Sequence, residues 1–103
     1  MTETISGRLV LEDSDVLGRL TIDDGLIGAI EPDDSAPADV LVVPGFIDVH
    51  VHGWGGHDAM GGVEALSAMA RALGGRGVTS FLPTSVTATF EKRTVFADAV
   101  RTW

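Results

Sequence analysis

The hydrophobic and polar positions first describe a β-rich stretch. Residues 5–12, 16–22 and 26–31 are apolar-rich and of strand length. Asp24-Gly25, between the second and third segments, is a two-residue hairpin signal. Residues 32–39 (PDDSAPAD) follow as a loop, since Pro, Asp and Ser each disfavour regular structure. The pattern predicts an antiparallel meander.

The pattern changes after residue 39. A continuous apolar run at 40–43 is stopped by Pro44-Gly45, and residues 46–52 read as a strand. Residues 53–62 form a glycine-rich loop. Residues 63–73 carry apolar side chains at helical spacing, which predicts an amphipathic helix that ends in a C-terminal cap at Gly74-Gly75.

A second strand and helix complete the pattern. Residues 78–84 are of strand type, and residues 90–103 read as a helix with Thr89 as its N-cap. Its apolar stripe comprises Phe96, Val100 and Trp103. The order strand, helix, strand, helix predicts an α/β fold with βα units on a parallel sheet. Two strands cannot complete such a sheet, so we expect the N-terminal portion of a longer protein.

Composition excludes several kinds of partner. The formal net charge is -8, with seven basic residues among 103, which argues against a nucleic-acid or anionic-membrane surface. No cysteine is present, so a metal site must use nitrogen and oxygen ligands. Because the sequence has neither a signal peptide nor a run of ~20 apolar residues, we expect a cytoplasmic protein.

The candidate chemistry lies in the strand at 46–52. Side chains alternate across a strand, so one face carries Phe46, Asp48, His50 and His52, and the other carries Ile47, Val49 and Val51. The β-branched face suits packing against helices. Two imidazoles at i and i+2 can reach one ion at about 2.0–2.1 Å each. The alternative is a pair of ordinary hydrogen-bonded or solvated histidines.

Three stretches carry a resemblance to a known family. PGFIDVHVHG (44–53) resembles the first-strand signature of the amidohydrolase superfamily. HGWGGHDAM (52–60) and GVTSFLPTSVT (77–87) are similar to the N-acetylglucosamine-6-phosphate deacetylase family. The resemblance implies that residues 1–43 form part of a composite β-sandwich. Residues 44–103 would then form the first two βα units of a TIM-like β/α barrel.

The resemblance also implies a site and a reaction. His50 and His52 would ligate a divalent metal, zinc or iron, in a site that is binuclear in some members. The family hydrolyses N-acetylglucosamine 6-phosphate to glucosamine 6-phosphate and acetate, and its members are generally homodimers. The remaining ligands, the catalytic acid and the phosphate-binding groups would lie beyond Trp103. The chain alone is therefore expected to be inactive and prone to aggregation.

Other residues near the pair have two interpretations each. Asp48 would either orient a ligand histidine or serve as a buried structural acid. His57 is a candidate third ligand, although a loop position near the substrate is the favoured interpretation. Gly53 would turn the chain after the strand, and Trp54 would cover the pocket or simply pack.

Two other functions remain open at this point. One is a different amidohydrolase, such as a cyclic amidase or a nucleobase deaminase. The other is a non-catalytic β-rich interaction module, which would fold stably without metal.

Overall fold

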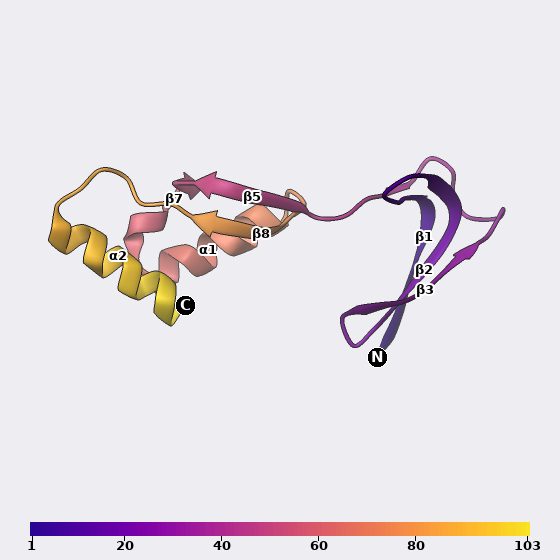
Figure 1. Ribbon diagram of the computed structural model, residues 1–103, viewed down its shortest axis with the longest axis horizontal. Helices are drawn as coiled ribbons and strands as arrows, with labels where there is room; N and C mark the ends of the chain where they lie inside the picture. The colour runs from indigo at the N-terminus through magenta and orange to yellow at the C-terminus, as the bar shows by residue number, and fades with distance from the viewer. The chain divides into compact units, whose positions relative to one another are not determined.

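The computed structural model describes residues 1–103, which divide into two compact units, Met1–Pro44 and Gly45–Trp103. The first unit contains one sheet and the second contains two, and each unit is described by itself below (Figure 1). The break falls at Pro44-Gly45, where proline lacks the N–H that a continuing strand would need.

The first unit is a mixed four-stranded sheet. Its strands are β1 (Thr2–Val10), β2 (Asp15–Asp23), β3 (Leu26–Pro32) and β4 (Leu41–Val42), in the order β3-β2-β1-β4. The first three strands are antiparallel, as predicted, and β4 pairs parallel to β1. Asp24 (φ 49°) and Gly25 (φ 80°) form the two-residue hairpin turn, which requires positive φ at both positions.

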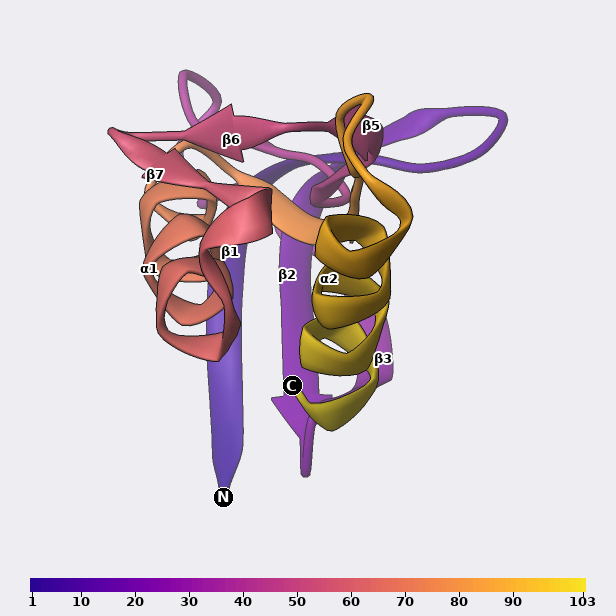
Figure 2. The same ribbon diagram turned by 90° about the vertical axis from the view of Figure 1, so that its left-hand side faces the viewer.

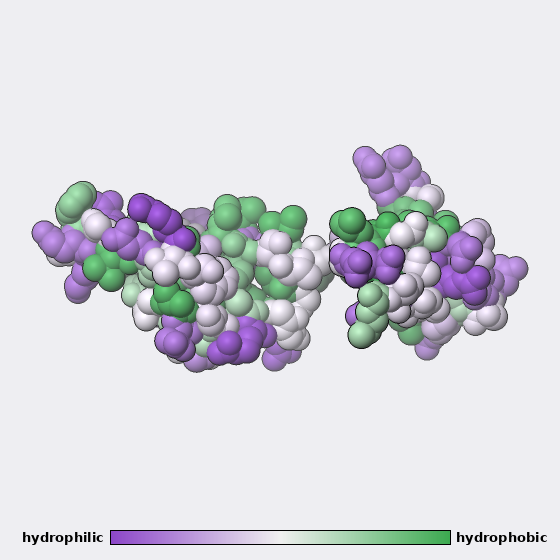
Figure 3. Space-filling model, turned by 90° about the horizontal axis from the view of Figure 1, so that it is seen from below, coloured by the Kyte–Doolittle hydropathy of each residue, from purple (hydrophilic) through white to green (hydrophobic).

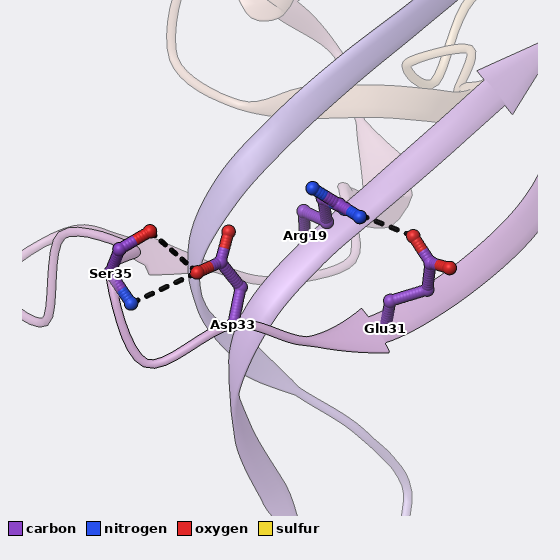
Figure 4. Close-up of polar contacts among 4 residues, drawn as sticks. All are labelled: Arg19, Glu31, Asp33 and Ser35. Carbon is purple, nitrogen blue, oxygen red and sulfur yellow. Dashed lines mark hydrogen bonds and ion pairs between the residues drawn. The ribbon is translucent and has the colours of Figure 1, made fainter.

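Two polar contacts hold the end of β3 and the loop after it (Figure 4). Arg19 and Glu31 are cross-strand partners, and the guanidinium Nε donates to the carboxylate at 2.9 Å, which raises the pKa of Arg19. Asp33 accepts hydrogen bonds from the hydroxyl and the backbone N–H of Ser35, and these bonds lower the pKa of Asp33. The loop at 32–39 is thus stabilised by an Asx-type turn.

The second unit alternates strands and helices. Its principal elements are β5 (Phe46–Val51), α1 (Val63–Gly74), β8 (Val78–Pro83) and α2 (Phe90–Thr102). Between β5 and α1 lie β6 (Gly53–Trp54), β7 (His57–Asp58) and the short 3₁₀ helix η1 (Ala59–Gly61). The strands β5 and β8 pair in parallel, and both helices lie on the same side of the pair (Figures 1 and 2). The predicted α/β class is confirmed.

The core of this unit lies between the strand pair and α1. The fully buried side chains of Leu66 and Met69 pack with Val51 and Ala59. The helix α2 adds partly buried Phe96 and Val100 to this cluster. The predicted N-cap is confirmed, because the Thr89 side chain accepts the backbone N–H of Lys92.

The strand faces differ from the prediction. Of the three β-branched residues expected to pack against the helices, only Val51 is buried, whereas Ile47 and Val49 are 69% and 67% exposed. The strand β8 is the only element that packs extensively against β5, and the core cluster reaches β5 only at Val51. Within residues 1–103 the earlier part of this face is therefore left uncovered.

The predicted Gly74-Gly75 cap is confirmed, whereas the glycine-rich loop after β5 contains regular structure that was not predicted. The glycine-rich loop is ordered: β6 and β7 form a hairpin whose turn residues, Gly55 and Gly56, both have positive φ. The helix α1 does end at Gly74 with Gly75 as its C-cap, but Gly75 is right-handed (φ -64°). The glycine with positive φ after α1 is Gly77 (φ 84°). It ends a further turn, in which the N–H groups of Arg76 and Gly77 donate to the carbonyls of Leu73 and Gly74.

Many apolar side chains remain on the surface of each unit, where they form the green areas of Figure 3. In the first unit only Leu9 and Ala36 are buried among the apolar side chains, and Leu26 and Ile27 on β3 are more than half exposed. In the second unit Phe46 and Leu82 are similarly exposed. Neither helix has the length and apolar character needed to cross a membrane.

Removing a buried side chain of α1 should destabilise the second unit. Leu66→Ala is expected to lower the free energy of unfolding by about 2–5 kcal/mol, because it leaves a cavity in a fully buried position. Arg71→Ala, on the exposed side of the same helix, should change it by less than about 0.5 kcal/mol. Urea titration followed by circular dichroism measures both, and equal effects would contradict the core assignment.

Removing the Ser35 hydroxyl should raise the pKa of Asp33 toward its ordinary value, because that hydrogen bond is the largest cause of the lowering. Ser35→Thr, which keeps a hydroxyl, should leave the pKa low. The carboxyl carbon of Asp33, followed by NMR during an acid titration, reports the value. Since the folded pKa is depressed, the contribution to stability is complete above the unfolded pKa of about 3.9 and is lost as pH falls through the folded value.

Candidate metal centre

The end of β5 brings His50 and His52 together. Their Nε2 atoms lie 3.2 Å apart, with ring centroids 4.9 Å apart and ring planes at 71°. Both side chains are exposed. Two nitrogens bound at about 2.05 Å to a tetrahedral ion would lie about 3.3 Å apart, so the observed separation fits two ligands of one ion.

The ring of His52 is fixed by a main-chain acceptor. Its Nδ1 lies 3.1 Å from the carbonyl oxygen of Thr84, at the end of β8. A carbonyl can only accept, so Nδ1 is the nitrogen placed to donate a proton to this contact. The other ring nitrogen, Nε2, lies within hydrogen-bond distance of Nε2 of His50.

Asp48 forms a hydrogen bond with the main chain of His50. Its carboxylate accepts the main-chain N–H of His50 at 3.1 Å, at the position where the β5–β8 register shifts. The residue is half-buried, and it has no hydrogen bond to either imidazole ring. It therefore holds the strand that carries His50.

The hairpin after β5 has a structural role in this arrangement. A Cβ on Gly53 would lie 2.5 Å from the carbonyl oxygen of His57, so the two short strands require glycine at this position. Trp54 pairs with His57 across the hairpin and is 47% exposed. The hairpin returns to β5 through the Ala59 N–H, which donates to the carbonyl of His52 at 2.8 Å.

The chain places only two ligand side chains together. Across residues 1–103 no group of three or more His, Cys, Asp or Glu side chains could hold an ion. His57 is exposed on β7 and does not join the pair. Two histidines are fewer than the three protein ligands that a catalytic zinc usually has.

Sequence reasoning missed the acceptor for His52. The contact uses the main-chain carbonyl of Thr84, whose hydroxyl donates to the carbonyl of Leu82. Every residue type has such a carbonyl. No signal in the side chains could therefore have identified it without the register of β5 against β8.

Comparisons with known proteins show what the chain is similar to. The chain is 39% identical over 97 residues to N-acetylgalactosamine-6-phosphate deacetylase of Escherichia coli O157:H7. The match covers 85% of the chain and 25% of that protein. No known family profile matches it. The similarity is thus to deacetylases of amino-sugar 6-phosphates.

Two further relatives are named N-acetylglucosamine-6-phosphate deacetylase. The protein from Bacillus subtilis (strain 168) is 39% identical over 80 residues, which is 68% of the chain and 20% of the relative. The protein from Vibrio furnissii is 40% identical over 82 residues, which is 71% of the chain and 21% of the relative. The predicted resemblance is confirmed: the chain is similar to part of these deacetylases and spans a quarter or less of their length.

The acceptor role of Asp48 can be tested by amide exchange. Asp48→Ala should make the His50 amide exchange about 10-fold faster with deuterium, because a hydrogen bond worth about 1–2 kcal/mol is lost. Asp48→Asn keeps a side-chain oxygen and should stay within about threefold of the parent. Exchange measured residue by residue by NMR distinguishes the two variants, and equal rates in all three proteins would contradict the assignment.

Proposed function

We propose that this chain forms part of a metal-dependent deacetylase that hydrolyses N-acetylglucosamine 6-phosphate to glucosamine 6-phosphate and acetate. The observation that carries the proposal is the convergence of the His50 and His52 Nε2 atoms, 3.2 Å apart, at the end of a strand. The names of the three relatives support the substrate class. The whole activity would need the ligands and acid that residues 1–103 do not supply.

The proposed architecture follows from the same resemblance. The parallel strands β5 and β8, with α1 between them in sequence, would be the first two βα units of a β/α barrel. The mixed sheet β1 to β4 would be part of a β-sandwich. Barrel enzymes carry their active sites at the carboxyl ends of the strands, and His52 directly follows β5 there. The complete protein would be a cytoplasmic homodimer.

The donor set suits zinc or iron, because both accept imidazole nitrogen. When bound, such an ion would act as a Lewis acid toward the acetamide carbonyl and would activate water at neutral pH. His50 and His52 would hold it through Nε2. Asp48 and Thr84 would keep the main chain of one histidine and the ring of the other in place.

N-acetylgalactosamine 6-phosphate is a second candidate substrate. The relative whose match covers 85% of the chain is named for N-acetylgalactosamine 6-phosphate. The two sugars differ in the configuration of one hydroxyl group. Residues 1–103 include no assigned sugar-binding group that would distinguish them.

The proposal predicts metal loss in two histidine variants and none in a third. His50→Ala and His52→Ala of the full-length protein should each lose at least one equivalent of bound metal and more than 99% of the acetate released from either sugar phosphate. His57→Ala is the matched control, because His57 is an exposed histidine outside the pair. Elemental analysis and an acetate assay measure both quantities. Unchanged metal content in the first two variants would refute the ligand assignment.

A further inference from the structure

We propose that Thr84 is a positioning residue for His52: its main-chain carbonyl selects the Nδ1–H tautomer and directs Nε2 toward His50. The inference rests on the proposed metal site for its functional meaning, since an ion needs the Nε2 lone pair. The tautomer itself is a property of the metal-free protein. It can therefore be tested separately.

The geometry determines which nitrogen is protonated. The distance from His52 Nδ1 to the Thr84 oxygen is 3.1 Å, within the range of an N–H···O hydrogen bond. If Nδ1 lacked its proton, its lone pair would face the lone pairs of the carbonyl. Hydrogen bonds of this kind to one ring nitrogen commonly determine how the other nitrogen is used.

Thr84 is itself held by two further hydrogen bonds, one from its N–H and one from its hydroxyl. The Thr84 N–H donates to the carbonyl of Val51 at 2.9 Å, and the Thr84 hydroxyl donates to the carbonyl of Leu82 at 3.1 Å. Val51 is 8% exposed and belongs to the core that α1 packs against. Val51, the residue before His52, thus links Thr84 to the buried core of the unit.

The two histidines are supported differently. The ring of His52 has an acceptor at Nδ1, whereas His50 is held through its main-chain N–H by Asp48. No hydrogen bond reaches Nδ1 of His50 in the structure. The proposal therefore applies to His52 alone.

The test weakens one carbonyl without changing a side chain. Replacing residue 85 by the α-hydroxy analogue of serine turns the 84–85 amide into an ester, whose carbonyl is a poorer acceptor. The Ser85 N–H that is lost makes no hydrogen bond in the structure. The matched control is an ester between residues 85 and 86, because the Ser85 carbonyl accepts none either. Cell-free translation of the full-length protein can supply both.

The readout is the ring ¹⁵N spectrum of metal-free protein at about pH 8.5, well above the ordinary histidine pKa. The His52 signals are identified by their loss in His52→Ala. We expect the Nδ1–H tautomer in the parent and in the control ester, and a shift toward Nε2–H in the 84–85 ester. Zn²⁺ affinity, measured by competition with a chelator, should fall about 10–100-fold in the 84–85 ester alone.

Thr84→Val separates the carbonyl from the hydroxyl. It removes the bond to Leu82 but keeps the branched side chain and the carbonyl, so the tautomer of His52 should not change. An Nε2–H tautomer in the parent, or the same tautomer in parent and 84–85 ester, overturns the proposal. Failure of the metal-site proposal looks different: His52→Ala would then bind Zn²⁺ as well as the parent does.

Discussion

The parallel pairing of β5 with β8 is the constraint on which the second unit depends. Parallel strands cannot be joined by a tight turn, so the chain must cross over the sheet, and α1 makes that crossing. The crossing buries Leu66 and Met69 against Val51. The same pairing brings the end of β8 beside the end of β5, where Thr84 meets Val51 and His52. Core and candidate site thus depend on one strand register.

The elements of this fold follow closely from local sequence. The meander, the Asp24-Gly25 hairpin and the Thr89 cap were predictable, because each depends on residues near one another in the chain. The β6–β7 hairpin was missed, since consecutive glycines are typical of irregular loops as well as of tight turns. The exposed positions of Ile47 and Val49 were also missed, because the alternation along a strand does not show which other elements cover its face.

In the candidate site, too, the features set by neighbouring residues were predictable and those set by tertiary structure were not. The proximity of His50 and His52 follows from their i, i+2 spacing, because alternate side chains on a strand share a face. Their supports depend on tertiary structure and on a local irregularity. Thr84 lies 32 residues from His52, and the Asp48 contact occurs where the register shifts. Periodicity alone gives neither contact.

The unequal support of the two rings determines which ring would have to move in the proposed site. The His52 ring is anchored at Nδ1 by a main-chain carbonyl, whereas the contact of the His50 ring is with Nε2 of His52. His50 and His52 would hold an ion through the same two nitrogens that contact each other in the structure. That contact would therefore open when the site is filled, and the reorientation would fall on His50, whose ring has no anchor of its own.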